Sequence, residues 1–317
     1  MRDAPLISVI MSVHNHAAFV VDAVESVLKQ TFADWELILI NNGSTDRSPA
    51  LIDELARRDP RVRPVHQEDI GLPAARNRGI GLARGPWIAY LDSDDVWFPN
   101  TLETYARYVA AHAQAQFVFG FAHRLRGARI TVLPGEHQHR PVGTKELFER
   151  MFLTPLTVCH RRELWEQAGR FDEALRWCDD YDLFLRMSLS CVFEPVGRAL
   201  GLRRRHDGNL SAPSGRSQQV EAEVLRRFAE GAGRAVLDER HVRRRLGRVY
   251  ARAARRYLGE RDYGQALALA QEAQALTPTW RNRMLCRLCT WLAPRSHAAR
   301  RTLETSTPSP PAAHGWH

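Results

Sequence analysis

The sequence predicts an α/β protein with a mainly parallel central sheet flanked by helices, followed by an α-helical extension. Three observations support this prediction. Short apolar runs alternate with amphipathic helical patterns through the first hundred residues, which is typical of βαβ units. Polar clusters follow directly after two of these runs, where a parallel sheet collects its ligand-binding side chains. From residue 218 onward the strand patterns stop, and the chain is rich in alanine, arginine and leucine.

The elements of the first part alternate between strand and helix. Ile7–Val13 is a short, mostly apolar run, as a strand buried on both faces requires. Apolar residues then recur at spacings of three and four, which predicts a helix over Phe19–Leu28. The same reasoning predicts, in order, strand Leu37–Ile40, helix Ser48–Arg58, strand Val62–Val65, helix Pro73–Ala83 and strand Trp87–Leu91.

The middle of the chain has a mixed pattern. Thr101–Ala111 is predicted to be a helix and Phe117–Phe121 a strand, and residues 124–145 are predicted to form a loop or hairpin. Gly, Asn, Ser and Pro gather in residues 201–217, which indicates the end of a domain. We therefore expect one α/β domain over residues 1–215, a helical extension over 216–295 and a disordered, Pro- and Ser-rich tail over 296–317.

The composition is that of a globular protein, with 44% hydrophobic and 26% charged residues in a chain of 317. It excludes wholesale disorder, a collagen-like repeat and a small disulfide scaffold. No run of eighteen apolar residues is present, so we expect no membrane-spanning helix. The first residues lack a signal-peptide pattern and the five cysteines are irregularly spaced, so we expect a cytoplasmic protein with reduced thiols.

The net charge of +9 favours anionic partners. The chain lacks basic motifs interleaved with aromatic residues, so we expect no nucleic-acid partner and retain nucleotide diphosphates and acidic lipid surfaces. Within the helical extension, apolar residues recur at helical spacings among arginines from Trp280 to Arg295. That pattern suits a helix lying in an anionic interface, and packing against the first domain is the alternative.

The strongest chemical signal is Asp92-Ser93-Asp94-Asp95, which follows directly after an apolar strand. Three neighbouring carboxylates repel one another unless a cation or hydrogen-bond donors compensate their charge. A hard dication such as Mg²⁺ or Mn²⁺, with diphosphate oxygens completing its shell, is one solution. A loop that only caps the next helix is the alternative, because a single Asp-x-Asp is common.

Two further clusters accompany this one. Asn41-Asn42-Gly43-Ser44-Thr45-Asp46 follows the second strand and can either pair with a base or ribose or simply form a turn and a helix cap. Arg76 and Arg78 lie early in the third predicted helix, a suitable position to meet phosphates.

Taken together, these motifs resemble the family 2 glycosyltransferases, inverting enzymes of the GT-A fold. The resemblance rests on ISVIMSVHNHAAFVVDAVESVLKQTFADWELILINNGSTD, then on GLPAARNRGIGLARGPWIAYLDSDDVWFP, GRFDEALRWCDDYDLFLRM and LRRRHDGNLS, and so spans roughly residues 6–211. It implies a Rossmann-like nucleotide-binding half and transfer of a sugar from a nucleotide-diphosphate donor, of the UDP type, to a glycan or lipid-linked acceptor. Bacterial surface polysaccharides are the implied product class, and Mn²⁺ or Mg²⁺ the implied cofactor.

The resemblance also assigns roles to matching residues at the donor end of the site. It implies that Asp92 and Asp94 hold the metal ion and the donor diphosphate, with His206 beside them. It implies that Asn42 contacts the uracil ring and that Arg76 lies near the base and the diphosphate. Three more positions of the matched motifs are expected to complete the donor site, namely Val13, Asn15 and Ser93.

The acceptor end depends on an acidic pair. Asp180 matches the second acid of the family's Glu-Asp motif, which implies that it is the general base. Asp179, or neighbouring backbone, is then expected to orient it. The alternative is that the acids from Asp179 to Asp182 only stabilise a helix N-terminus.

The sequence departs from the family pattern at two positions. The common Asp-Asp pair is Asn41-Asn42 here, and an amide carbonyl accepts the uracil N3 proton without charge assistance. Three interpretations therefore stay open. The enzyme binds uridine more weakly, it recognises another base such as thymine, or the chain is a non-catalytic binding or scaffold protein whose site has decayed. The position that usually carries Glu in the base motif carries Asp179 here. This is a milder change, because Asp179 is also a carboxylate, although a shorter one.

Overall fold

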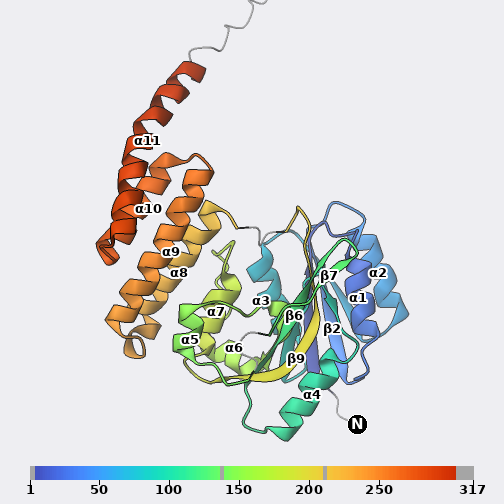
Figure 1. The fold of residues 1–317 in the computed structure, drawn as a ribbon. Helices are drawn as coiled ribbons and strands as arrows, with labels where there is room; N and C mark the ends of the chain where they lie inside the picture. The colour runs from blue at the N-terminus through green and yellow to red at the C-terminus, as the bar shows by residue number, and fades with distance from the viewer. Residues whose placement is uncertain (1–3, 136–138, 210–212, 305–317) are drawn as a thin grey trace, which may run out of the picture. The chain divides into compact units, whose positions relative to one another are not determined.

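The protein structure is a computed structural model that describes residues 4–135, 139–209 and 213–304, without the side chains of 294–304. Nine strands within these ranges form one sheet. They are β1 (Ile7–Val13), β2 (Trp35–Asn42), β3 (Val62–Gln67), β4 (Trp87–Tyr90), β5 (Val96–Trp97), β6 (Phe117–Arg126), β7 (Arg129–Thr131), β8 (Val158–Arg161) and β9 (Phe193–Arg204). Their order is β3-β2-β1-β4-β8-β6-β9-β5, with β7 paired to β6. Figure 1 shows the strands of this sheet as arrows between helices.

The first half of the sheet is parallel. β1 pairs in parallel with β2 and β4, and β2 pairs in parallel with β3. Their register brings Val13 opposite Asn41 and Asn41 opposite His66. The carboxyl ends of these strands therefore meet at one edge of the sheet, as the alternating pattern predicts.

Helices cover both faces of this parallel half. They are α1 (Val20–Leu28), α2 (Ser48–Arg58), α3 (Leu72–Leu82) and, after β5, α4 (Thr101–Ala111). One core joins α1, α2 and α4 to the alternate side chains Val9 and Met11 of β1. On the opposite face α3 approaches so closely that a Cβ on Gly79 would lie 2.7 Å from Ile10 Cγ2. Residue 79 must therefore be a glycine for α3 to lie at this distance.

The second half of the sheet is mixed, and the sequence predicted it less fully. β8 runs antiparallel to both β4 and β6, whereas β6 and β9 are parallel. β9 is only partly buried along most of its length, so it lacks the apolar run that marked the earlier strands. β6 and β7 form a hairpin, one of the two expectations for residues 124–145. Three helices belong to this half, α5 (Thr144–Glu149), α6 (Arg162–Ala168) and α7 (Asp179–Met187).

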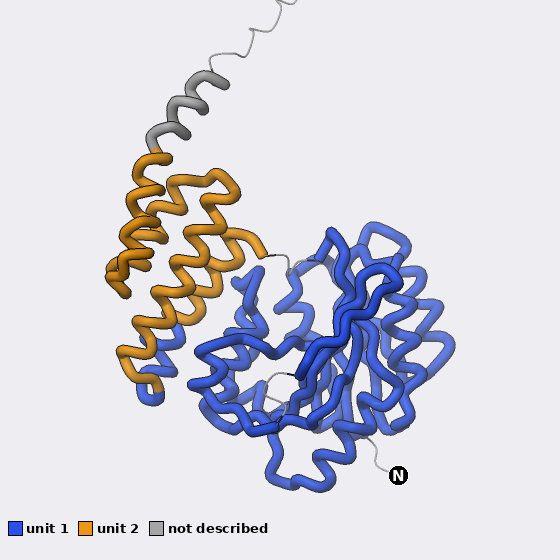
Figure 2. The backbone as a smooth tube through the Cα atoms, viewed as in Figure 1, with its two compact units in different colours: residues 1–211, 227–236 blue, residues 212–226, 237–317 orange. Residues whose placement is uncertain are grey.

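The chain divides into two compact units (Figure 2). Residues 1–211 and 227–236 form the first, and residues 212–226 and 237–317 form the second. The division therefore cuts through helix α8 (Gly215–Glu230), whose last residues belong to the first unit.

The second unit is helical wherever the structure describes it in regular elements. α9 (Glu239–Gly259) and α10 (Tyr263–Leu276) pack against each other, and α11 (Trp280–Glu304) packs on both. α11 thus continues beyond residue 295, where the sequence placed the start of the tail, and residues 305–317 lie outside the described residues. Among the described helices, none combines the length and the apolar content that crossing a membrane requires.

Candidate active site

A buried arginine joins two acidic segments that lie far apart in the sequence. Arg76 projects from α3 and is 5% exposed. Its Nη2 donates to Asp92 Oδ1 and its Nη1 to Asp179 Oδ2, each at 2.8 Å. Despite its burial, these two carboxylates raise the pKa of Arg76, so the guanidinium stays charged. The turn after β4 and the first residue of α7 are therefore connected by a charge-assisted pair of bonds.

Asp180 lies beside this bridge but is not part of it. Its Oδ1 accepts a hydrogen bond from the backbone N–H of Tyr181 at 2.8 Å, and no partner of its Oδ2 is found among the described residues. Burial, and then the charge of Asp179, raise the pKa of Asp180 to about 6. Asp180 is therefore a carboxylate with one available oxygen and an increased affinity for a proton, as a general base requires.

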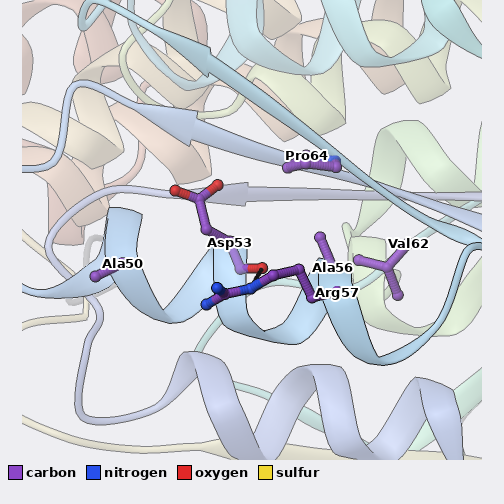
Figure 3. Close-up of a pocket in the computed structure, with 6 residues that line it drawn as sticks. All are labelled: Ala50, Asp53, Ala56, Arg57, Val62 and Pro64. Atoms are coloured by element: carbon purple, nitrogen blue, oxygen red, sulfur yellow. Dashed lines mark hydrogen bonds between the residues drawn. The ribbon is translucent and has the colours of Figure 1, made fainter.

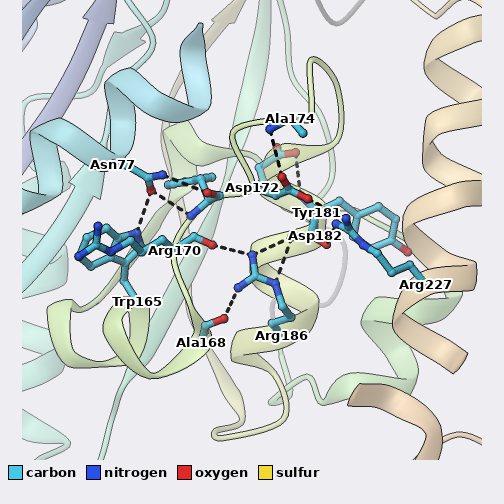
Figure 4. Close-up of polar contacts among 12 residues, drawn as sticks. Asn77, Trp165, Ala168, Arg170, Asp172, Ala174, Tyr181, Asp182, Arg186 and Arg227 are labelled. Carbon is cyan, nitrogen blue, oxygen red and sulfur yellow. Dashed lines mark hydrogen bonds and ion pairs between the residues drawn. The ribbon is translucent and has the colours of Figure 1, made fainter. Parts of the chain in front are cut away.

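The loop before α7 is held by side chains from three helices (Figure 4). Asn77 of α3 bonds the segment in both directions, since its Nδ2 donates to the Phe171 carbonyl at 3.0 Å and its Oδ1 accepts from the Phe171 N–H at 2.9 Å. On α7, Asp182 accepts from Arg186 at 2.7 Å and from Arg227 of α8 at 2.6 Å. These contacts fix the start of α7, while Cys178 turns the chain into the helix with a left-handed φ of 60°.

Asp94 meets residues that follow β9. Its Oδ2 accepts from His206 Nε2 at 3.0 Å and from Asn209 Nδ2 at 2.8 Å. The neighbouring Asp95 is buried and accepts from the Arg204 N–H at 2.7 Å. Burial and the charges around it raise the pKa of Asp95 well above its ordinary value. Asp95 therefore anchors the turn to β9, and Asp94 and His206 face each other.

This donor set suits a divalent metal ion in part. The carboxylate of Asp94 and the imidazole of His206 are ligands that Mn²⁺ accepts, and both are partly exposed. One oxygen of Asp92 already accepts from Arg76, which leaves the other for a metal or a diphosphate. Among the described residues no three His, Cys, Asp or Glu side chains converge as a metal cage. A metal here would take the rest of its coordination shell from diphosphate oxygens and water, as Mg²⁺ commonly does.

The ends of β1 and β2 supply three more of the predicted donor residues, namely Val13, Asn15 and Asn42. Asn15 has a left-handed φ of 54°, and its Oδ1 accepts from the backbone N–H of Thr45 at 2.8 Å. The carbonyl of Val13 is within 3.4 Å of the Ser44 hydroxyl. Asn42 is buried, and its side chain is hydrogen bonded to the last residue of β3 and to the loop after it. The β1 and β2 loops are thus bonded to each other at the carboxyl edge of the sheet.

Comparison with known proteins decides the family. Residues 8–178 match the description "Glycosyl transferase family 2" over more than half of the chain. The chain belongs to glycosyl transferase family 2. It is therefore a glycosyltransferase, and the resemblance inferred from its motifs is confirmed.

Two relatives show the extent of the match. The glycosyltransferase is 43% identical over 222 residues to GlyG of Streptococcus pneumoniae, covering 65% of this chain and 72% of GlyG. It is 34% identical over 186 residues to the uncharacterised glycosyltransferase EpsJ of Bacillus subtilis, covering 56% of this chain and 54% of EpsJ. The chain thus spans about half the length of EpsJ, and the substrates and partners of the whole protein are proposals.

Two solved structures share the fold of the glycosyltransferase. Residues 1–349 of S. aureus TarS, in complex with UDP-GlcNAc, match with a TM-score of 0.66 over 95% of this chain and 90% of that one, at 20% identity. The mannosyltransferase PcManGT from Pyrobaculum calidifontis, in complex with GDP-Man and Mn²⁺, matches with a TM-score of 0.57 over 96% and 89%, at 16% identity. The fold is therefore GT-A, with a mostly parallel sheet and C-terminal helices, as predicted.

Sequence reasoning missed several residues that the fold brings to this edge. His16 Nδ1 lies 2.7 Å from the hydroxyl of Ser93, and Phe19 stacks on His206 with ring centroids 4.6 Å apart. Asn209 bonds Asp94, as described above. The only sequence signal for His16 was its place three residues after a predicted strand, which many histidines share.

A surface cavity of the glycosyltransferase lies elsewhere (Figure 3). Residues of α2 and β3 line it, namely Ala50, Asp53, Ala56, Arg57, Val62 and Pro64. None of them is a predicted site residue, and Asp53 pairs with His66 at 2.9 Å. We therefore assign the chemistry to the carboxyl edge of the sheet.

Proposed function

We propose that this enzyme is an inverting glycosyltransferase that moves a sugar from a UDP-sugar to a hydroxyl of a glycan or lipid-linked acceptor. The observation that carries the proposal is the position of Asp180. It offers one available carboxylate oxygen and a pKa of about 6, next to an arginine bridge that reaches the Asp92 turn. A base and a diphosphate-binding turn in one site are what a single displacement needs.

In the proposed reaction, Asp180 accepts the proton of the acceptor hydroxyl. The acceptor oxygen forms a bond to the anomeric carbon while the bond from that carbon to the diphosphate oxygen breaks, and UDP leaves with the bonding electrons. Because attack and departure are on opposite sides, the anomeric configuration inverts. The Tyr181 N–H holds the base in place, and Asp179 holds Arg76.

Asp94 and His206 are proposed to hold Mn²⁺ or Mg²⁺, with Asp92 alongside. When bound, the metal would neutralise the negative charge that develops on the departing diphosphate. The Mn²⁺ in the PcManGT structure supports this proposal as an analogy of fold. Arg76, Asn15 and Ser93 are proposed to complete the donor site around it.

We further propose a role in the assembly of bacterial surface polysaccharides. The chain is 31% identical over 196 residues to a putative colanic acid biosynthesis glycosyl transferase, WcaA of Escherichia coli, covering 59% of this chain and 67% of WcaA. Its five cysteines are free thiols, which suits the cytoplasm, where we place the enzyme.

We propose that α11 brings the enzyme to the inner face of the membrane. Four exposed apolar side chains recur at spacings of four and three on one face of α11. They are Trp280, Met284, Leu288 and Trp291. Asn282, Leu285 and Cys289, on a different face, are buried. The segment 280–293 contains three arginines and no acidic residue. An aromatic stripe flanked by arginines suits the headgroup region of an anionic bilayer.

Vesicle sedimentation tests this contact. We expect binding to phosphatidylglycerol vesicles, weaker binding to phosphatidylcholine vesicles, and loss of binding in Trp280→Ser/Trp291→Ser. Val192→Ser, which removes an exposed apolar side chain from the first unit, is the control and should bind normally. Unchanged vesicle binding by the double variant would contradict the membrane proposal. A double variant that differs from the wild type only in its oligomeric state would contradict it as well.

A panel of nucleotide sugars tests the catalytic proposal. We expect nucleotide release and sugar transfer with a UDP-sugar, stimulated by Mn²⁺. Nucleotide binding without release or transfer for any donor would instead favour the non-catalytic binding protein that the Asn41-Asn42 pair left open.

A further inference from the structure

The side-chain oxygen of Asn42 is fully occupied inside the protein. Its Oδ1 accepts from Gln67 Nε2 at 2.7 Å and from the Ile70 N–H at 3.2 Å. An amide oxygen has two acceptor positions, so both are taken. Its Nδ2 donates to Asp69 Oδ1 at 2.7 Å. Asn42 therefore has no oxygen left to accept a proton from a donor base.

Asp69 brings a carboxylate to the same place from the loop after β3. Its Oδ1 accepts from Asn42 and from the Gly71 N–H at 3.0 Å. Its Oδ2 has no hydrogen bond to any described residue, and Asp69 is exposed. One oxygen of Asp69 thus fixes the side chain, and the other is available at the carboxyl edge of the sheet.

The position of Asp69 is fixed by close packing as well as by hydrogen bonds. Gly43, directly after Asn42, has a φ of +68°, and a Cβ there would lie 2.4 Å from the backbone nitrogen of Asp69. The turn after β2 and the loop after β3 can approach this closely only because residue 43 is glycine. The carboxylate is therefore held beside the end of β2 and does not sample the surface freely.

We propose that Asp69, in place of Asn42, accepts the N3 proton of the donor's uracil ring. This inference rests on the proposed UDP-sugar function and assigns the base-recognition residue of that site. The negative charge that the Asn41-Asn42 pair lacks is supplied from a different strand end, 27 residues later in the chain. Uridine recognition in this enzyme thus keeps a charge-assisted hydrogen bond.

The single available oxygen also selects among bases. Uracil and thymine each present one ring N–H between two carbonyl groups, which matches one acceptor. Guanine presents two adjacent N–H donors and is matched best by both oxygens of a carboxylate, one of which is already used here. Cytosine has a bare ring nitrogen at the same position, which repels a carboxylate. At the ring nitrogen, the available oxygen therefore matches uracil and thymine better than guanine or cytosine.

Asp69→Asn tests this assignment with little change of shape. The amide oxygen of the new side chain can still accept from Asn42 and Gly71, while the available acceptor becomes an amide donor. We expect UDP binding with Mn²⁺, measured by calorimetry, to weaken by about ten- to a hundredfold, the usual value of a hydrogen bond to a charged group. CDP binding should strengthen relative to UDP, because an amide N–H can donate to the cytosine ring nitrogen.

Glu68→Gln is the matched control, since it removes the same charge from the neighbouring residue of the same loop. It should leave the ratio of UDP to CDP affinity unchanged. A merely misfolded Asp69→Asn would lose both nucleotides together, so an unchanged ratio in this variant overturns the inference. If the wild-type enzyme binds UDP and Asp69→Asn binds it equally well, the assignment is wrong while the proposed function stands. If the wild type binds no UDP, the proposed function fails first, and the inference with it.

Discussion

Replacing Asp180 by asparagine separates the chemical step from donor binding. The amide oxygen in Asp180→Asn can still accept the Tyr181 N–H, but the side chain cannot accept the acceptor's proton. We expect transfer to fall by about 10²- to 10⁴-fold, the usual contribution of a general base. Binding of UDP with Mn²⁺ should stay close to that of the wild type, because Arg76 bonds Asp179 and Asp92, not Asp180.

The same variant should be more stable at high pH. The pKa of Asp180 is raised from its ordinary value of 3.8 to about 6, so the folded state binds the proton more tightly than the unfolded state. Stability is therefore lost as the pH rises from about 4 to about 6 and is not regained above it. At 1.36 kcal/mol for each pH unit, the cost at pH 8 is at most about 3 kcal/mol. The amide in Asp180→Asn does not titrate, so this cost disappears.

Transfer assays, calorimetry and urea unfolding at pH 4 and pH 8 measure all three effects. The reasoning requires low turnover, normal UDP binding and a gain in unfolding free energy at pH 8 that vanishes at pH 4. Wild-type turnover in Asp180→Asn would remove Asp180 as the base. Asp179 and Asp182 would then be the candidates, although ion pairs with Arg76 and with Arg186 and Arg227 occupy both.

Four further results are expected. The kcat/KM of the wild type should rise about tenfold per pH unit up to about pH 6, where Asp180 ionises, and then level off, as a pH–rate profile will show. Asp94→Asn should weaken Mn²⁺-dependent UDP binding in calorimetry, since an amide oxygen is a poorer ligand than a carboxylate for a hard dication; metal-independent binding of equal strength would contradict this. Arg76→Met should cost about 3–5 kcal/mol of unfolding free energy, because two carboxylates lose their cation; a cost near zero would show that the bridge is not structural. Gly79→Ala should cost about 1–3 kcal/mol by the same measurement, because its Cβ would meet Ile10 at 2.7 Å, and a neutral effect would show that α3 can shift.

The strand and helix pattern of the parallel half could be predicted closely. Three elements have the predicted bounds, namely Ile7–Val13, Ser48–Arg58 and Thr101–Ala111. The bounds were predictable because buried strands and amphipathic helices impose distinct hydrophobic patterns on the sequence. Strands β8 and β9 escaped prediction. β9 is long but only partly buried, so its residues carry no such period.

Site residues on the carboxyl edge were predictable for a related reason. The sequence determined that Asp92, Asp94 and the Asn41-Asn42 pair would gather at one edge, because parallel strands place all their carboxyl ends there. Resemblance to a family then added Asp180 and His206. None of this says which atoms remain available, since hydrogen-bond partners far apart in the chain leave no local signal.

Only the tertiary structure decided how the charges pair. Arg76 is 103 residues from Asp179, and their bond is what leaves Asp180 as the acid with an available oxygen. Asn42 and Asp69 likewise lie on different strand ends, and their contact decides which of them can face a donor base. The sequence by itself determined the parallel half of the fold and the edge that carries the site, because periodicity and the alternation of strands with helices are local properties. Contacts between residues far apart in the sequence determined the role of each side chain. Burial and electrostatics depend on neighbours that only the fold brings together.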